Sequence, residues 1–487
     1  MANEISFEKR LWDAASILRG NLSPAQYPPV ILGLIFLKYI SDISELCEHA
    51  EEKLPDGLKH TVFQVPNCAR WNYIESKADY EEIGEVLNRA MLAVEIENVA
   101  LRGVLPQIYA SPEIDKRRLR EVVHLFSDVS VVDSEASEDL LGRTYEYCLK
   151  MFSENSGKLL GEYYTPASVV ETIVKIMKPD HGKIYDPCCG SGGMLMQTAK
   201  YARLYAAGVD SLEFYGQDNN TPARNNCIMN LVLRGIKADL GQCSADTFFN
   251  DQHKGLKADY IMANPPFNQS DWGRDKLYDD ARWRYGVPPA GNANYAWLQH
   301  MISHLTSDGE MGIVLTNGSL SSVYGGEKNI RKKIIEEDLL RGIITMPRRM
   351  FYTTPISVSI WFLSKKKKRR GHTLFVDARS MGQVVNRKFV ELSSKEVDKL
   401  VTAFDEFEQG QDIDEAGFCR VVSSSEIAKN AYNIAPERYI GEHYTDNYDN
   451  QFREEIQELS KSLLSLFKRS NELQGEIVQR LENVTND

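Results

Sequence analysis

Asp259-Tyr260-Ile261-Met262-Ala263-Asn264-Pro265-Pro266-Phe267 runs from an apolar stretch into two consecutive prolines. The apolar stretch predicts a buried strand, and proline, which has a fixed φ and no N–H, cannot extend a strand ladder. The chain must therefore leave the sheet in a rigid turn. Two hydrogen-bond acceptors and an aromatic ring in that turn suit an exocyclic amine on a planar ring, although a plain proline turn is the alternative. We predict the following catalytic group: Asn264, Pro265, Pro266 and Phe267.

A glycine-rich loop precedes this motif in the segment Ile184-Tyr185-Asp186-Pro187-Cys188-Cys189-Gly190-Ser191-Gly192-Gly193-Met194-Leu195. Glycines let a backbone approach a ligand closely, and the start of a helix offers free N–H groups. The dinucleotide fingerprint fails at Leu195, and no Gly-Lys-Ser/Thr of a phosphate-binding loop occurs in the chain. The loop therefore fits a nucleoside with an amino-acid tail, whose ammonium Asp186 could bind. Alone, such a loop is also typical of a tight strand–helix turn.

Two further acids follow the glycine loop near the ends of predicted strands. The run 212–216 predicts a strand that ends close to Asp218, where doubly wound nucleotide sites carry the acid that binds ribose hydroxyls. Asp246 follows the next short run and would close the same crevice near the base. A surface carboxylate is the alternative at both positions. The residues predicted to bind the nucleoside are Asp186, Gly190, Ser191, Gly192, Gly193, Asp218 and Asp246.

The chain divides into three regions by its patterns. Residues 1–155 show helix-period apolar residues and predict a helical domain. Residues 156–400 alternate short strands with helical stretches, which is typical of a mostly parallel α/β sheet. Residues 401–487 form a C-terminal segment that ends in an amphipathic helix. The predicted strands are 183–186, 212–216, 239–243, 258–263, 310–316, 341–346 and 357–363, the last of them antiparallel.

The C-terminal helix carries an apolar stripe with steps of three and four residues, apart from one step of seven. The stripe consists of Ile456, Leu459, Leu463, Leu466, Leu473, Ile477, Leu481 and Val484. Such a stripe packs either on the core of its own chain or on a partner helix. Both interpretations stay open, and we predict that 401–487 serves subunit docking.

The composition favours a globular protein of a reducing compartment. A length of 487 residues predicts two or three domains, and a hydrophobic content of 43% supports packed cores. Eight cysteines occur without a C-x-x-C pair, so we expect neither a disulfide framework nor a metal site. The polar N-terminal residues predict no signal peptide, and the first apolar run, 30–39, is too short to span a bilayer. We therefore expect a cytoplasmic protein that makes no membrane contact.

Most of the chain resembles the modification subunit of type I restriction-modification systems, an N6-adenine DNA methyltransferase. The resemblance lies in the helical segments 12–15 (Trp-Asp-Ala-Ala) and 32–41, in Gly161-Glu162-Tyr163-Tyr164-Thr165-Pro166, in 186–193, in 264–267 and in 292–300. It implies S-adenosylmethionine as cofactor and a Rossmann-like sheet of seven strands. It also implies cofactor contacts for a group that precedes the glycine loop: Glu162, Tyr163, Tyr164, Thr165, Pro166 and Ala167.

The same resemblance implies partners, and the net charge agrees with them. The partners are double-stranded DNA, a specificity subunit, a second copy of the chain and a restriction subunit that translocates DNA. A net charge of −12 is unfavourable for a protein that grips DNA alone, because phosphate contacts supply most non-specific affinity. Either local basic clusters such as 365–370 contact DNA, or a partner provides the affinity. If the run 365–370 does not contact DNA, it is a solvated loop.

Two alternative functions remain open, and so does the role of one loop. The Asn-Pro-Pro-Phe motif also suits RNA and protein-glutamine amino-methyltransferases, because a glutamine amide presents a planar NH₂ group. A catalytically inactive scaffold is the second alternative. The loop 271–291 is long and polar and contains aromatic residues, so it either closes over the target base or serves as a plain connection.

Overall fold

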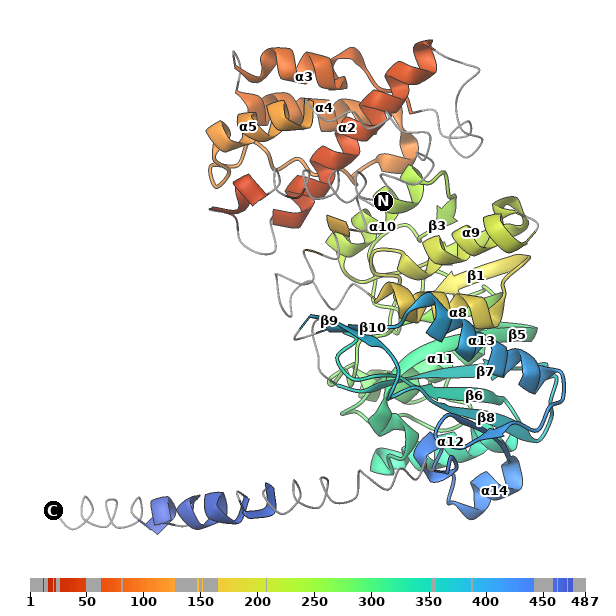
Figure 1. The fold of residues 1–487 in the computed structure, drawn as a ribbon. Helices are drawn as coiled ribbons and strands as arrows, with labels where there is room; N and C mark the ends of the chain where they lie inside the picture. Colours follow the sequence, from red (N-terminus) through yellow and green to blue (C-terminus); the bar gives the residue numbers. More distant parts are fainter. Residues whose placement is uncertain are drawn as a thin grey trace. The chain divides into compact units, whose positions relative to one another are not determined.

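A computed structural model gives the fold of the chain (Figure 1). The described residues are 12, 16–20, 22, 27–49, 63–79, 82–127, 147–148, 151, 165–206, 208–351, 356–386, 389–441, 459–461, 463–470 and 472–475. They form two compact units, Met1–Ile440 and Gly441–Asp487.

One large sheet organises the first unit, in the order β11-β12-β8-β6-β7-β5-β4-β1-β2-β3. From β3 to β5 all neighbours are parallel, and β7 lies antiparallel between β5 and β6. The strands are β1 Gly182–Asp186, β2 Leu212–Gly216, β3 Ala238–Asp239, β4 Ala258–Ala263, β5 Leu305–Thr316, β6 Leu340–Thr345, β7 Val358–Ser364, β8 His372–Asp377, β11 Asp414–Glu415 and β12 Cys419–Ser423. The α/β class and the antiparallel strand near 357–363 are confirmed.

The predicted count of seven strands is wrong. The sheet has ten strands, because β8, β12 and β11 extend it beyond β6. β8 pairs in parallel with β6, and β12 then runs antiparallel to β8. A separate pair consists of β9 Gln383–Asn386 and β10 Phe389–Glu391. The pairing of β8 with β6 and of β12 with β8 joins segments that lie far apart in the sequence, and no local pattern reveals it.

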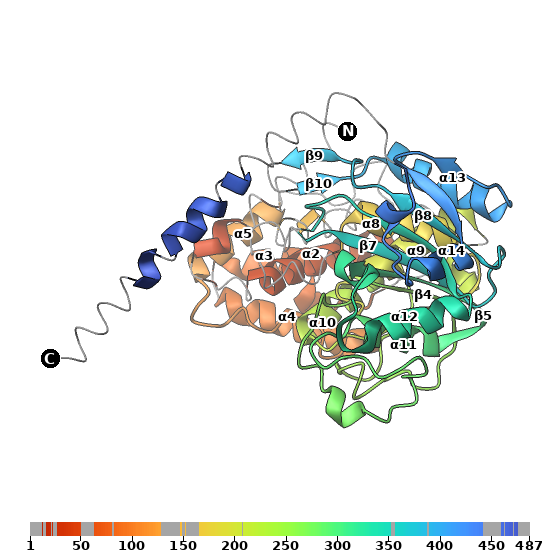
Figure 2. The ribbon, with the colours of Figure 1, turned by 90° about the horizontal axis from the view of Figure 1, so that it is seen from below.

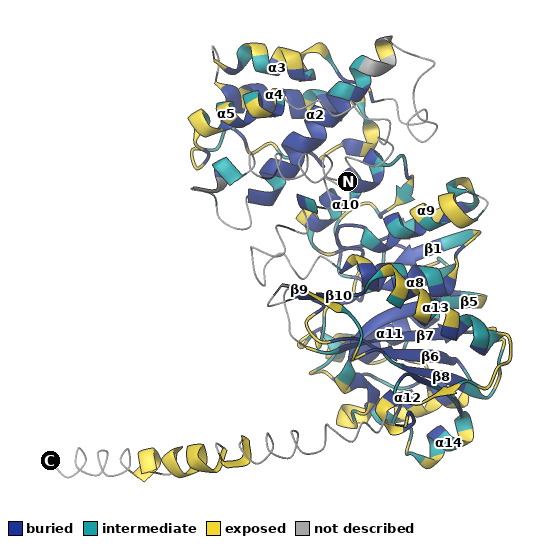
Figure 3. Cartoon of the chain, in the orientation of Figure 1, coloured by how far each residue is buried: buried dark blue, intermediate teal, exposed yellow. Residues whose placement is uncertain are grey.

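Helices cover both faces of the sheet (Figure 1, Figure 2). One face packs α8 Ala167–Met177, α9 Gly193–Tyr205 and α13 Ser394–Glu408, and the other packs α11 Asn294–His304, α12 Glu327–Glu336 and α14 Ser424–Lys429. Each face of the sheet has its own hydrophobic core beneath these helices. Successive residues of β7 face opposite sides, so Phe362 belongs to the core under α8, α9 and α13, while Trp361 and Leu363 belong to the core under α11, α12 and α14. The central strands β6 and β7 are therefore buried on both faces, as Figure 3 shows.

The described residues before 128 contain helices and no strand. The longer helices are α2 Tyr27–His49, α3 Trp71–Ala78, α4 Ile83–Glu97 and α5 Lys116–Ser127. Their core also includes Met229 and Leu233 from α10 Thr221–Leu233, so this helical region packs directly on the sheet domain. The boundaries 1–155, 156–400 and 401–487 stay a prediction, although α13, β11, β12 and α14 belong to the first unit.

The second unit contains described residues that are helical and exposed (Figure 3). They lie within the predicted amphipathic helix and include Leu459, Leu463, Leu466 and Leu473 of the predicted stripe. The remaining stripe residues, Ile456, Ile477, Leu481 and Val484, lie outside the described residues. Among the helices that the structure describes, none is long and apolar enough to cross a membrane.

Candidate active site

A cavity opens at the carboxyl ends of β1, β2 and β4, where parallel α/β sheets bind their ligands. It brings together both halves of the predicted site. Its lining includes the predicted residues Thr165, Ala167, Asp186, Gly190, Ser191, Gly193, Asp218, Asp246, Asn264 and Pro266. Four further predicted residues do not line the cavity, but each is the sequence neighbour of a residue that does: Pro166, Gly192, Pro265 and Phe267. Glu162, Tyr163 and Tyr164 lie outside the described residues.

The glycine loop has the shape that a close ligand approach requires. Gly192 has a φ of +86°, and a Cβ there would lie 2.7 Å from Cys227 Sγ. A larger residue would therefore meet both backbone strain and a steric clash. Gly192 directly precedes α9, whose first N–H groups face the loop. The role of Gly192 is thus to shape the loop, while Gly190, Ser191 and Gly193 line the cavity.

Two of the predicted acids hold the loops that form the cavity. Asp218 Oδ2 accepts a hydrogen bond from Gly190 N at 2.9 Å, and Asp218 Oδ1 accepts one from Asn220 N at 2.8 Å. Asp246 Oδ1 accepts one from Phe248 N at 2.8 Å. Each carboxylate keeps lone pairs beyond these bonds. The geometry therefore allows a ligand contact in addition to the structural one.

Asp186 is the most strongly perturbed acid of the cavity. It is 2% exposed at the end of β1. Burial raises the pKa of its carboxyl to about 8, the Cys188 N–H opposes this shift, and the charge of Asp218 adds to it. Asp186 therefore holds a proton at neutral pH until a cation reaches it.

Asn264 presents an unpaired acceptor to the cavity. Its Nδ2 donates to Thr165 Oγ1 at 3.0 Å, which fixes the orientation of the amide. Its Oδ1 is buried and has no hydrogen-bond partner in the described part of the chain. An unsatisfied buried acceptor is unfavourable by about 1–3 kcal/mol, so this oxygen indicates a ligand donor. Thr165, predicted only as a cofactor contact, thus also orients Asn264.

Three aromatic side chains for which the sequence predicted no individual role lie at the cavity or against the predicted catalytic turn. The Phe267 ring meets Phe351, which follows β6, in an edge-to-face contact with centroids 5.4 Å apart. Phe248 and Trp297 both line the cavity, with ring centroids 4.5 Å apart. Only Trp297 lay in a segment that the resemblance singled out. The other two lie in loops that become neighbours only when the sheet forms.

The loop 271–291 is part of the core and not a free lid. Its three large aromatic side chains are buried: Trp272, Trp283 and Tyr285. Arg282 donates hydrogen bonds to the carbonyls of Thr247 at 3.2 Å and Phe248 at 2.6 Å. Both of these residues line the cavity. The loop therefore supports a wall of the site, and closure over a base would require it to leave the core.

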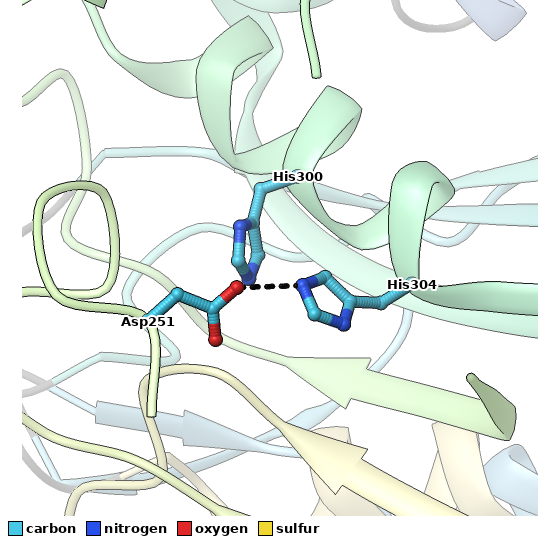
Figure 4. A group of neighbouring side chains, drawn as sticks. All are labelled: Asp251, His300 and His304. Atoms are coloured by element: carbon cyan, nitrogen blue, oxygen red, sulfur yellow. Dashed lines mark hydrogen bonds and ion pairs between the residues drawn. The ribbon is translucent and has the colours of Figure 1, made fainter. Parts of the chain in front are cut away.

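Asp251, His300 and His304 bring three potential metal ligands together (Figure 4). Arg282 donates to His300 Nδ1 at 3.1 Å, so the neutral His300 ring carries its hydrogen on Nε2 and offers no free lone pair there. His304 bonds Leu256 O through Nδ1 and Asp251 Oδ2 through Nε2, both at 3.0 Å. Burial would raise the pKa of Asp251, but the bond from His304 lowers it to about 2. The group is therefore a hydrogen-bond network within the fold.

Five of the six side chains in the basic run 365–370 have partners within the fold. Ion pairs join Lys366 to Asp308, Lys367 to Asp338, Lys368 to Glu408 and Arg369 to Asp412, and Lys365 donates to Leu305 O. Four of the six charges pair with acids from several elements, so most of the run is not a free cationic patch. This favours the second interpretation of the net charge, in which a partner provides DNA affinity.

Two protein-family models together match nearly all of the chain. A model described as N-6 DNA Methylase matches residues 136–447, and a model of the HsdM N-terminal domain matches residues 7–126. The type I restriction enzyme HindI methylase subunit of Haemophilus influenzae is 35% identical over 86% of this chain and 99% of the relative. The MjaIX methylase subunit of Methanocaldococcus jannaschii is 34% identical over 98% of this chain and 91% of the relative.

Solved structures share the fold. A type I restriction-modification methyltransferase subunit from Streptococcus thermophilus superposes with a TM-score of 0.76, at 23% identity, over 90% of this chain and 99% of that chain. A second structure, from a study of complex assembly in the type I R-M system, gives a TM-score of 0.65 at 17% identity over 97% and 98% of the two chains. Both likenesses extend over the helical region as well as the sheet.

Proposed function

The chain belongs to the N-6 DNA methylase family, and from this premise we propose that it is the modification subunit of a type I restriction-modification complex. In this function it transfers a methyl group from S-adenosylmethionine to N6 of an adenine in double-stranded DNA. One observation carries the proposal: Asn264, whose buried Oδ1 has no hydrogen-bond partner among the described residues, lines the same cavity as the glycine loop. An acceptor for the adenine amine and a cofactor cradle thus share one site.

The residues of the cavity fit the cofactor. Asp186 would hold the ammonium in the amino-acid tail of the cofactor. The loop residues Gly190, Ser191 and Gly193 would approach the same tail closely. Asp218 would bind the ribose hydroxyls of the cofactor. Asp246 would lie near the adenine edge, and Thr165, Pro166 and Ala167 would close the cavity. For Glu162, Tyr163 and Tyr164 the cofactor contacts rest on the resemblance alone. Bound S-adenosylmethionine supplies a methyl group activated by a sulfonium.

The catalytic turn would act on the amine. The adenine nitrogen is a weak nucleophile because its lone pair is delocalised into the ring. Asn264 Oδ1 and the Pro265 carbonyl would each accept one N–H and so localise that lone pair on nitrogen. A strong base is then unnecessary before attack, since the proton leaves once nitrogen is positively charged. Much of the acceleration comes from positioning, which supplies roughly 7–11 kcal/mol in well-oriented reactions.

The target base must leave the duplex to reach this turn. Flipping is unfavourable by about a few kcal/mol. Stacking on an aromatic ring is worth about 1–3 kcal/mol per base and would offset part of this. Phe267 offers such a ring, and its contact with Phe351 limits the positions that it can take.

Binding of S-adenosylmethionine is expected to tighten as the pH rises toward about 8, the pKa of the buried Asp186. Below that pH the free protein holds a proton on Asp186, and a cationic ligand must displace it. Affinity should therefore rise with pH until the α-ammonium of the cofactor itself begins to lose its proton. Calorimetry in two buffers with different ionisation enthalpies would measure the released proton. A pH-independent affinity across this range, or proton release that survives in Asp186→Asn, would contradict this assignment.

The proposed partners follow from the same function. We expect a specificity subunit to read the DNA sequence, a second copy of this chain to flank the DNA, and a restriction subunit that translocates DNA to join the complex. The paired basic run and the net charge of −12 support a partner as the main source of DNA affinity. We propose a cytoplasmic location, which agrees with the free cysteines among the described residues.

Methyl transfer by the purified complex tests this function. The chain would be co-expressed with its specificity subunit and assayed with tritiated cofactor on duplex DNA, RNA and protein. Tritium should enter duplex DNA alone and appear as N6-methyladenine, and a host strain that lacks the chain should lose one methylated motif. Transfer to RNA or to protein glutamine in preference to DNA would establish the alternative function, and absence of transfer to any of them would favour a scaffold.

A further inference from the structure

The residue that follows the catalytic turn has an unusual backbone. Asn268 directly follows Phe267 and has a φ of +51°, in the left-handed region. Residues other than glycine are uncommon there, and asparagine is among the few that tolerate it. The two prolines of the turn have no N–H with which to anchor it. The Asn268 N–H is the first backbone donor after Phe267.

That donor belongs to a reciprocal pair of hydrogen bonds. Asn268 N donates to Asn294 Oδ1 at 3.1 Å, and Asn294 Nδ2 donates back to Asn268 Oδ1 at 2.9 Å. Asn294 is the first residue of α11 and is fully buried. Its Nδ2 also donates to Ser319 Oγ at 2.9 Å. The exit from the catalytic turn is thus joined to a rigid helix end.

The Asn268 oxygen receives two more donors from separate segments. Thr316 Oγ1 donates to it at 3.0 Å, and Asn292 Nδ2 donates to it at 3.3 Å. Thr316 ends β5, the strand beside β4, from which the catalytic turn emerges. One side-chain oxygen therefore links the turn to β5, to α11 and to the segment before α11. The Asn268 Nδ2 takes part in none of these bonds.

We infer that Asn268 and Asn294 form a latch that positions the catalytic turn for base flipping and methyl transfer. This inference rests on the proposed function and assigns roles to residues outside the Asn-Pro-Pro-Phe motif. The turn is held on one side by the β4 ladder and by the Asn264–Thr165 bond, and on the other side by the latch. Without the latch the Phe267 ring and the Pro265 carbonyl are held less firmly, because the next anchor after Phe267 is then the bond from Ala293 N to Gln269 O at 2.9 Å. The proposed cofactor residues lie at the end of β1 and in the loop after it, after β2, after β3 and at the start of α8. None of them bonds to Asn268 or Asn294 among the described contacts, so we expect cofactor binding to stay intact.

Three variants distinguish the effect of losing the latch bonds from the effect of a change in backbone strain. Asn268→Gly keeps the left-handed backbone but removes the oxygen acceptor. Asn268→Asp keeps an oxygen for all three donors. Asp271→Gly is the matched control, because Asp271 has a φ of +52°, is exposed, and bonds through its side chain only to the neighbouring Ser270 at 3.3 Å among the described contacts. Asn268 is itself exposed, so its replacement should leave the fold intact.

Each variant would be assayed in complex with the specificity subunit. The measurements are kcat, the dissociation constant of S-adenosylmethionine, the melting temperature, and the fluorescence of a duplex with 2-aminopurine at the target position. Asn268→Gly should lower kcat about tenfold or more and reduce the flipped-base signal, because a misplaced turn loses part of the positioning effect. Cofactor affinity should stay within about twofold, as for a change in positioning alone. Asn268→Asp should restore most of kcat, and Asp271→Gly should match the wild type.

Several results would overturn the latch. In an active wild-type complex, unchanged kcat and fluorescence in Asn268→Gly would show that the turn needs no such support. Equal losses of kcat and cofactor affinity, or an equal loss in Asp271→Gly, would show a general structural effect. A failure of Asn268→Asp to recover activity would remove the oxygen acceptor from the explanation. An inactive wild-type complex would refute the proposed function, and this inference with it.

Discussion

Replacing Asn264 with alanine is expected to reduce methyl transfer by about 10²–10³-fold, the usual loss when one preorganised polar group at a reacting centre is removed. Among the described residues Asn264 Oδ1 has no hydrogen-bond partner, and Thr165 fixes the amide through Nδ2, so the oxygen is available to accept a ligand N–H. Alanine removes that acceptor but leaves the glycine loop and the acids in place. Single-turnover transfer of a tritiated methyl group, divided by the number of cofactor-binding sites, measures the loss.

Cofactor affinity and a Thr165 variant serve as controls for the Asn264 experiment. The dissociation constant of S-adenosylmethionine should change little in Asn264→Ala, and a tenfold weakening would indicate a structural role instead. Thr165→Val keeps the shape of threonine but releases the amide, whose nitrogen could then face the amine. We expect Thr165→Val to slow transfer less than Asn264→Ala does, and Thr165→Ser to remain close to the wild type. If Thr165→Val had no effect on transfer, the amide would be oriented by something else.

The sequence was informative where local pattern and function coincide. The strand that ends in Asn-Pro-Pro-Phe and the acid before the glycine loop could both be recognised, because proline and glycine restrict the backbone locally. The structure places Asn264, Asp186, Asp218 and Asp246 at one cavity, since the carboxyl ends of parallel strands meet at one edge of the sheet. Order along the chain was thus enough to assemble most of the candidate site.

The features that the sequence did not reveal depend on long-range contacts. Phe351 meets Phe267 only because β6 and β4 belong to the same sheet, and no spacing in the sequence relates them. The run 365–370 has the appearance of a free cationic segment until its acids arrive from other elements, such as Asp338 and Glu408. The dual role of Thr165 likewise required the distance between its hydroxyl and the Asn264 amide.

Replacing Asp218 with alanine is expected to weaken S-adenosylmethionine binding by about 10–100-fold, which corresponds to the roughly 1.5–3 kcal/mol of a hydrogen bond to a charged group. Asp218 holds Gly190 N and Asn220 N, so alanine removes both the predicted ribose contact and a support of the glycine loop. Calorimetric titration measures the change. At saturating cofactor, methyl transfer should return close to the wild-type rate, because the Asn264 turn is unaffected.

Asp218→Asn separates the two roles of this carboxylate. Asparagine keeps one oxygen, which can accept the Gly190 N–H, but its amide nitrogen cannot accept the Asn220 N–H or a ribose hydroxyl. We expect its cofactor affinity to lie between those of the wild type and Asp218→Ala. An affinity unchanged in Asp218→Ala would place the residue outside the cofactor site. A rate that stays low at saturating cofactor would instead show that the glycine loop and the Asn264 turn are coupled, because both carry residues that line the same cavity.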